Sequence, residues 1–317
     1  RILDLDPERV ETITILKDAA ATSVYGSRAA NGVVVVETKV APDGDLSVSY
    51  NGTMTVQTPD LTDYNMMDAA TKLDTEWRAG LYNPASASDM NLYNRYRRNV
   101  LGGVDTYWLS KPLRTAFQHR HSASVSGGTE VFRYSLDINA AMQPGVMKES
   151  ANNTKGVNFN MSYMKEKFIM RANVSLNESN SSNSPYGSFS QYTRLNPYYI
   201  PEDANGNQQK VLDNNTVSGQ STVITNPLYD ATLGIKDLNN SLNMTTSLNL
   251  EYMVLRNLRI TEQLSYTRGM AGTDKFLPAD HTSFELEDDL TRKGSYFKST
   301  GEMTSWSSNL GINYNLV

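Results

Sequence analysis

The feature that most constrains the fold of this chain is a strict alternation of apolar and polar side chains over residues 46–57. The apolar set is Leu46, Val48, Tyr50, Gly52, Met54 and Val56. Because successive side chains of a strand point to opposite faces, the segment predicts a strand with one apolar face. Its length matches what a tilted strand needs to cross a lipid bilayer.

Seven later segments repeat the alternation, which predicts an antiparallel sheet of about eight strands. They are residues 118–127, 131–143, 157–163, 168–176, 242–252, 258–266 and 306–316. Their apolar faces carry no Lys or Arg and a single acid, Glu262, while the opposite faces carry Arg133, Asp137, Arg171, Glu251 and Arg259. A lipid-facing Arg near the bilayer midplane costs roughly 2–4 kcal/mol, so this segregation favours a transmembrane β-barrel, with Glu262 near a membrane interface.

The connections between these segments alternate in length. Short ones at residues 127–129, 165–167 and 253–257 alternate with long ones at 58–117, 144–154, 177–240 and 269–301. Outer-membrane barrels have short periplasmic turns and long external loops, so the long connections are predicted to lie outside the cell. Six aromatic residues are then predicted to form a girdle at the periplasmic strand ends. They are Phe132, Tyr134, Tyr163, Phe168, Tyr252 and Tyr314.

The composition argues against several other classes of protein. The net charge of −5 gives no attraction to a phosphate backbone, so no nucleic-acid partner is expected. No apolar run approaches the ~20 residues of a membrane helix. The chain lacks a phosphate-binding glycine loop, a nucleophile elbow and an identifiable carboxylate pair. His119 and His121 share a strand face without a third ligand. We therefore expect no catalytic residues, no metal site and no cofactor.

The opening segment has a different pattern, which predicts strand, short helix, glycine turn and strand. Residues 12–16 form a β-branched run, and Asp18 can cap a helix over residues 19–25. Gly26 and Ser27 then end this helix, and Asn31-Gly32 forms a turn. The four valines at 33–36 are typical of a strand that is buried on both faces.

This segment closely resembles the C-terminal end of the plug domain of TonB-dependent outer-membrane transporters, and within them the SusC/RagA branch. The resemblance rests on Leu16, Lys17, Asp18, Tyr25, Gly26, Ser27, Arg28, Ala30, Asn31, Gly32, Val33, Thr38 and Lys39. Blocks at residues 113–117, 122–130, 132–135, 196–198 and 226–228 resemble the first hairpin and the third loop of the same family. The resemblance thus covers most of the chain, and its motifs become less specific toward the C-terminus.

The resemblance implies a fold and a domain division. The expected fold is all-β and membrane-bound: part of an antiparallel transmembrane β-barrel, about eight strands of a larger plugged barrel, preceded by part of an α+β plug. Residues 1–40 would end the plug, and residues 45–317 would start the barrel, with external loops at 58–117, 177–240 and 269–301. We expect the chain to be an internal fragment whose missing N-terminal part holds the signal sequence and the TonB-contacting box. The resemblance also implies a structural and gating motif, which consists of Asp18, Tyr25, Gly26, Ser27, Arg28, Asn31 and Gly32.

The resemblance also implies a function, which is TonB-dependent import of oligosaccharides across the outer membrane of a Gram-negative, Bacteroidota-like cell. The expected partners are a SusD-like surface lipoprotein, the TonB-ExbB-ExbD complex and outer-membrane lipid. Peptide import by the same family is the first alternative, and a siderophore or cobalamin receptor is another. A non-transporting surface β-sandwich is the alternative from a different class, and the one-sided charge pattern argues against it.

The long loops contain the candidate ligand contacts. Residues 63–80 predict an amphipathic helix that packs on the loops through Met66, Met67, Ala70, Leu73 and Trp77. In the third loop, aromatic rings and polar side chains could stack on and hydrogen-bond a sugar. These candidates are Tyr186, Phe189, Tyr192, Arg194, Tyr198 and Tyr199. The sequence DANGN at 203–207 has partial calcium-loop spacing but lacks the bidentate Glu, so we interpret it as a turn.

Overall fold

The computed structural model describes residues 10–17, 32–38, 44–217 and 220–315 of the chain. The first part contains strands β1 (Val10–Leu16), β2 (Val33–Thr38) and β3 (Gly44–Gln57), helices α2 (Ala69–Arg78) and α3 (Ala87–Leu101), and the 3-10 turn η4 (Trp108–Ser110). The middle part contains β4 (Ala116–Gly128), β5 (Phe132–Pro144), β6 (Ala151–Lys165), β7 (Phe168–Ser182), α4 (Phe189–Tyr192), β8 (Val211–Val217), β9 (Gln220–Thr225) and α5 (Pro227–Asp230). The last part contains β10 (Lys236–Leu255), β11 (Leu258–Leu277), η5 (Thr282–Phe284), η6 (Leu290–Arg292) and β12 (Ser295–Tyr314).

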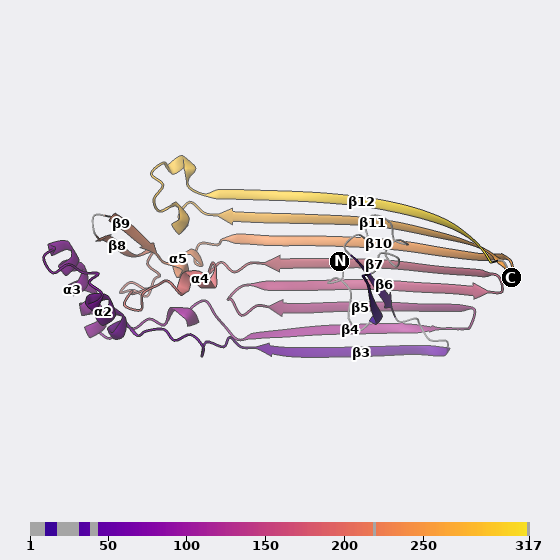
Figure 1. Cartoon of the computed structure of the whole chain (residues 1–317), viewed down its shortest axis with the longest axis horizontal. Coiled ribbons are helices and arrows are strands. Elements are labelled where there is room, and N and C mark those ends of the chain that lie inside the picture. The colour runs from indigo at the N-terminus through magenta and orange to yellow at the C-terminus, as the bar shows by residue number, and fades with distance from the viewer. Residues whose placement is uncertain (1–9, 18–31, 39–43, 218–219, 316–317) are drawn as a thin grey trace.

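One large antiparallel sheet dominates the molecule, and its strands follow one another in chain order. The order is β3-β4-β5-β6-β7-β10-β11-β12, because the β8–β9 hairpin forms a separate sheet inside a loop. In Figure 1 the long strands run side by side, and α2, α3, α4, α5, β8 and β9 gather beyond one end of the sheet. We call this the loop end, and the opposite end the turn end. The predicted sheet of eight alternating strands is confirmed among the described residues.

The strands are longer than the sequence pattern predicts. β10, β11 and β12 each contain 20 residues. At ~3.3 Å per residue such a strand is about 65 Å long, roughly twice the hydrocarbon thickness of a bilayer. The extra length shortens three connections to residues 145–150, 183–235 and 278–294. These strand ends were missed because their outer residues no longer alternate between apolar and polar types.

One face of the large sheet is apolar and uncovered. Met54 is 84% exposed and Trp306 is 78% exposed, and both lie on the face that the alternation assigns to lipid. Among the described residues, no second sheet packs against this face. A soluble sandwich would bury such rows between two layers, so the single layer argues directly against the β-sandwich alternative.

The predicted aromatic girdle lies at the turn end. Phe132 is opposite Tyr163, and Phe168 is opposite Tyr252, so the rings line up across neighbouring strands. Glu262 also lies toward this end, where its Oε1 accepts a hydrogen bond of 2.6 Å from the Ser308 hydroxyl. Glu262 is two positions from Leu264 on the same face, and its expected place near a membrane interface stays a prediction.

The apolar face carries more charge than the predicted strand segments include. Near the loop end, four charged residues lie on the same face as the apolar residues. They are Lys155, Glu178, Arg268 and Glu302. The expected absence of Lys and Arg therefore holds for the segments predicted from the sequence, but not for the full strands. The reason is the strand length, because the backbone pairing continues past the apolar rows.

β1 and β2 form an antiparallel hairpin that is separate from the large sheet. Both predicted strands are confirmed, but Val34 is 48% exposed, so the expected burial on both faces is wrong. Antiparallel pairing to a single partner strand leaves an open face, which explains the exposure. Gly32 takes φ +98°, and a Cβ at this position would lie 3.1 Å from the Leu16 carbonyl oxygen. This turn therefore requires glycine.

The buried core of the chain lies in the loops, not in the sheet. It contains Ala69, Leu73, Tyr82, Leu92, Tyr96, Trp108, Leu109, Tyr192, Tyr198, Tyr199 and Leu228, which we call the loop core. α2 begins later than predicted because Asp68 accepts a hydrogen bond of 2.7 Å from the Thr71 N–H and caps the helix there. Met66 and Met67 precede the helix and are exposed, so they do not supply its packing face.

Candidate functional site

The polar face of the sheet carries a dense array of amide and hydroxyl side chains, which we call the amide wall. It consists of Asn158, Asn160, Asn173, Ser175, Asn177, Ser179, Ser181, Asn239, Ser241, Asn243, Thr245, Ser247 and Thr267 on β6, β7, β10 and β11. Asn173 links two neighbouring strands, because its Nδ2 donates to Asn158 Oδ1 at 2.9 Å and to Asn160 Oδ1 at 2.7 Å. Asn160 Nδ2 in turn donates to Ser135 Oγ at 3.0 Å. The side chains thus hold one another in place.

A cavity of about 1340 Å³ is lined by the amide wall, by Val34 and Val36 of the β1–β2 hairpin, and by a part of β11 and β12 that includes the charged Glu302. The hairpin overlaps the large sheet in Figure 1, and the shared lining places it on the polar face. The uncharged donors and acceptors of the wall suit a neutral polar ligand, since amides and hydroxyls both donate and accept hydrogen bonds.

Asn158 is the most constrained residue of the amide wall. It is only 3% exposed, and its Nδ2 finds no hydrogen-bond partner within the described part of the chain. A buried donor without a partner costs about 1–3 kcal/mol. A hydrogen-bond acceptor that enters the cavity at Asn158 would remove this cost.

Charged side chains occur on the polar face both at the strand ends and beside the amide wall. Glu251 and Arg259 are near the turn end and are paired at 3.3 Å. Asp237 and Lys275 are near the loop end and are paired at 3.4 Å. Asp137 of β5 lies directly opposite Asn158 in the strand register, so the wall borders a carboxylate. The sequence alternation predicts the polar face but not how charged and neutral side chains are distributed along it.

Most of the predicted plug motif lies outside the described residues. This applies to Asp18, Tyr25, Gly26, Ser27, Arg28 and Asn31. Gly32 is described, and it takes a positive φ of +98° directly before β2. The gating role of the motif stays a prediction.

The predicted ligand-contact residues of the third loop are not all at a surface. Tyr192, Tyr198 and Tyr199 are between 0% and 5% exposed and belong to the loop core. Tyr186 and Phe189 are half-buried against this core, whereas Arg194 is exposed. In this structure the three buried rings pack against other loop residues, and ligand contact by the group stays a prediction.

Glu76 is the polar centre of the loop core. This buried carboxylate accepts hydrogen bonds from the hydroxyls of Tyr82 at 2.8 Å and Tyr198 at 2.9 Å. Lys72 lies 3.3 Å away and pairs with the other carboxylate oxygen. Burial, followed by the nearby negative charge of Glu76, raises the pKa of Tyr82 and Tyr198 above the usual range of a tyrosine. Both hydroxyls therefore remain donors across the physiological pH range.

Further contacts join the long loops into one unit. Trp108 Nε1 donates to the Asn196 carbonyl at 2.9 Å, and the buried Asp213 accepts from Arg95 and Tyr96. Asp230 accepts from the N–H and hydroxyl of Thr282 at 2.9 and 2.5 Å. The first, third and fourth loops are thus cross-linked by polar contacts, which no local sequence pattern predicts.

The partial calcium loop is a turn, as predicted. Asp203 Oδ1 accepts from the N–H groups of Asn205 at 2.8 Å and Asn207 at 2.9 Å, so the turn's own backbone uses this oxygen. Among the described residues, no group of three or more His, Cys, Asp or Glu side chains is placed to hold a metal. Within the same residues, no helix is long and apolar enough to cross a membrane.

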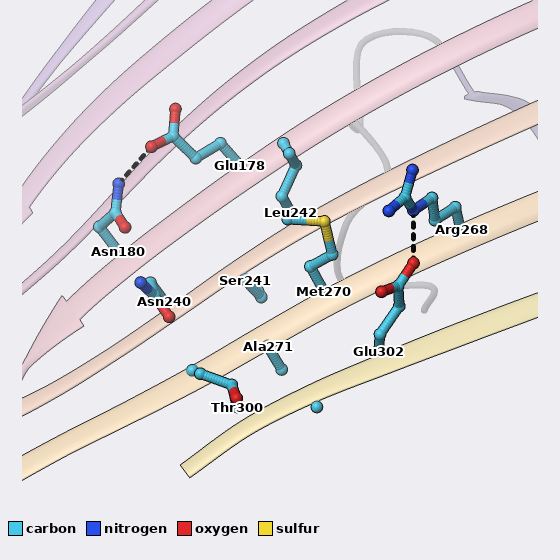
Figure 2. Close-up of a pocket in the computed structure, with 12 residues that line it drawn as sticks. Glu178, Asn180, Asn240, Ser241, Leu242, Arg268, Met270, Ala271, Thr300 and Glu302 are labelled. Carbon is cyan, nitrogen blue, oxygen red and sulfur yellow. Dashed lines mark hydrogen bonds and ion pairs between the residues drawn. The ribbon is translucent and has the colours of Figure 1, made fainter. Parts of the chain in front are cut away.

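A second cavity, of about 450 Å³, lies on the opposite face of the sheet near the loop end (Figure 2). Arg268 Nε donates to Glu302 Oε1 at 2.7 Å on one side of it, and Asn180 Nδ2 donates to Glu178 Oε1 at 2.7 Å on another. Leu242 and Met270 lie between these polar pairs (Figure 2). This cavity therefore marks the boundary between the apolar rows and the polar strand ends.

Comparison with known proteins gives consistent matches, although no family model matches the chain. The chain is 32% identical over 150 residues to the TonB-dependent receptor SusC of Bacteroides thetaiotaomicron, which is 46% of this chain and 13% of that protein. It is 28% identical over 146 residues to the TonB-dependent receptor P3 of Formosa agariphila, which is 45% of this chain and 13% of that protein. The matched part of the chain thus covers about an eighth of the length of these relatives.

The fold matches a solved structure over nearly the whole chain. A structure of the RagAB peptide importer in the open-open state superposes with a TM-score of 0.70 and 20% sequence identity, over 97% of this chain and 37% of that chain. At this identity the match shows the fold, and it identifies the large sheet as corresponding to part of a RagA-type barrel. The relatives are named as receptors and importers, which agrees with the expectation that the chain is not an enzyme.

Proposed function

We propose that this chain, which is a SusC/RagA-like TonB-dependent receptor sequence, works in nutrient import across the outer membrane. The single observation that carries the proposal is the division of the sheet into two faces. The apolar face is exposed and uncovered, as a lipid-facing surface must be, while the neutral amide wall faces the β1–β2 hairpin across a cavity. A barrel wall around a plug has this arrangement.

The proposed substrate is an oligosaccharide, bound with the help of a SusD-like surface lipoprotein. The sequence resemblance to SusC-like members implies this class, and the amide wall offers the hydrogen-bonding groups that sugar hydroxyls need. Energy would come from the TonB-ExbB-ExbD complex through a segment outside this chain. Tyr186, Phe189 and Arg194 remain the proposed loop contacts, because each keeps some exposed surface.

Peptide import is the second candidate. A specific observation favours it, because the matched solved structure is that of the RagAB peptide importer. A neutral wall of amides can also pair with the backbone N–H and C=O groups of an extended peptide.

Ligand identification separates these candidates. The receptor is purified together with its partner from cells grown on mixed nutrients, and co-bound molecules are identified by mass spectrometry. Glycan masses support the first proposal, and a peptide ladder favours the second. Deletion of the gene must also abolish growth on the identified nutrient while growth on glucose is unchanged. If growth on every oligosaccharide and peptide source survives the deletion, the import proposal is wrong.

The amide wall gives a residue-level test. Asn173→Ala removes two hydrogen bonds from the wall, so we expect slower uptake of the identified nutrient with normal receptor abundance. Asn309→Ala is a matched control, since Asn309 has the same parity but lies on β12, outside the cavity lining. Equal uptake by both variants would contradict a role for the wall.

A further inference from the structure

Two histidines on the apolar face of the sheet approach each other with the geometry of metal ligands. His121 Nε2 lies 3.2 Å from His119 Nδ1, and the ring centroids are 5.2 Å apart. Two imidazole nitrogens that bind one first-row ion at 2.0–2.1 Å with a tetrahedral angle are about 3.3 Å apart. The two nitrogens share a hydrogen bond, so one of them carries a proton, and an ion that replaced this proton would find them at nearly the required spacing.

The second nitrogen of His121 has a partner that sets its role. The Tyr50 hydroxyl lies 2.6 Å from His121 Nδ1, and the two rings are stacked with an interplanar angle of 22°. Metal-binding histidines commonly use their other ring nitrogen in such a hydrogen bond, which orients the ring and fixes the tautomer. In the tautomer with the proton on Nδ1, His121 donates to the Tyr50 oxygen and its Nε2 lone pair faces His119, and this is the tautomer that a bound ion would select.

Methionines lie on both sides of His119. Met54 of β3 and Met142 of β5 are directly opposite His119 in the strand register, on the same face. Directly opposite residues of an antiparallel pair have Cβ atoms about 4.5–5.5 Å apart. Both methionine side chains are exposed, at 84% and 53%, and their flexible thioethers can turn toward the imidazoles.

From this juxtaposition we infer that His119, His121, Met54 and Met142 form a binding site for monovalent copper. Thioether sulfur is a soft ligand that selects Cu(I), and imidazole also suits copper. The site takes residues from three consecutive strands, so a bound ion would clamp β3, β4 and β5 together. Carboxylates and thiolates, which would favour other ions, are absent from this set.

Copper binding by the receptor in detergent tests the site. Cu(I) is supplied without oxygen as its bicinchoninate complex, whose colour reports transfer to the protein. We expect one Cu(I) per chain for the wild type, and at least ~10-fold weaker binding for H119A and for H121A. His281→Ala is the matched control, because it removes the third histidine of the chain from a distant loop. Tyr50→Phe should weaken binding by about 10-fold through loss of the orienting hydrogen bond.

X-ray absorption of the loaded wild-type receptor tests the ligand set without relying on any variant. Nitrogen and sulfur scatterers together support the site, and the sulfur signal must vanish in a Met54→Leu, Met142→Leu double variant. The inference is overturned if the wild type takes up no Cu(I), if H119A and H121A bind as the wild type does, or if copper shows no sulfur ligand. Import assays are not part of this test, so it stands apart from the proposed function.

Discussion

Tyr198 donates a hydrogen bond of 2.9 Å to the buried carboxylate of Glu76, 122 positions earlier in the chain. This contact joins the third long loop to helix α2 of the first loop. Tyr82 donates to the same oxygen of Glu76 at 2.8 Å, so one carboxylate fixes two tyrosines from different parts of the loops.

The first prediction concerns this carboxylate. Glu76→Ala should leave two buried tyrosine hydroxyls without their acceptor, at a cost of about 1–3 kcal/mol in loop stability. Limited proteolysis of the intact receptor should then cut the loops faster than in the wild type. Asp74→Ala is the control, because Asp74 is exposed and pairs only with Arg78 at 2.8 Å on the surface of the same helix. Equal proteolysis of both variants would contradict the assigned role of Glu76.

A second prediction follows from the raised pKa of Tyr82 and Tyr198. Above pH ~10 the unfolded chain loses these protons while the folded loops retain them, so the folded loops bind more protons and their stability falls as pH rises. Absorbance at 295 nm should show tyrosines that titrate only when the loops unfold. Tyr82→Phe should weaken the pH dependence, and a tyrosine titration identical to that of a denatured chain would refute the prediction.

The apolar face gives a third prediction. Leu248 lies opposite Ala172 and Leu264 in the middle of this face, so Leu248→Arg should destabilise the membrane-inserted receptor by roughly 2–4 kcal/mol. Ser247→Arg, one position away on the polar face, should be tolerated much better. Denaturant unfolding in lipid vesicles measures both. If the two variants are equally stable, the apolar face does not meet lipid.

A fourth prediction concerns the hairpin turn. Gly32→Ala should destabilise the β1–β2 hairpin by about 1–3 kcal/mol, because φ +98° is strained for alanine and the new Cβ would crowd the Leu16 carbonyl. Hydrogen exchange of the β2 amide groups should accelerate. Gly301→Ala is the comparison, since a Cβ there meets no atom within 4 Å. Unchanged exchange in Gly32→Ala would show that the turn tolerates a side chain.

The large sheet was predictable because its signal is local. Every second residue of a strand meets the same environment. The alternation within one segment therefore predicts the face of the sheet on which residues such as Val157 and Phe159 lie. The extended strand ends were not predictable in this way, since polar residues such as Asn180 and Asn240 continue the apolar face there.

The interior of the loops was less accessible to prediction. The rings of Tyr192, Tyr198 and Tyr199 fit equally well with ligand contact or with packing, and only distant partners such as Glu76 decide their burial. Helix α3 and the β8–β9 hairpin were missed, although Ser86 and Asp89 at the start of α3 form a recognisable helix start. The amide wall was not predicted, because its shared hydrogen bonds depend on strand register.

The length of β10, β11 and β12 has a mechanical consequence in the proposed membrane orientation. About half of each strand extends beyond the lipid as a stiff, hydrogen-bonded part of the sheet. The cross-linked loops are attached to the end of this extension. A docking partner would therefore bind a rigid surface that lies well outside the membrane. A force on that surface would be transmitted to the barrel wall along continuous strands.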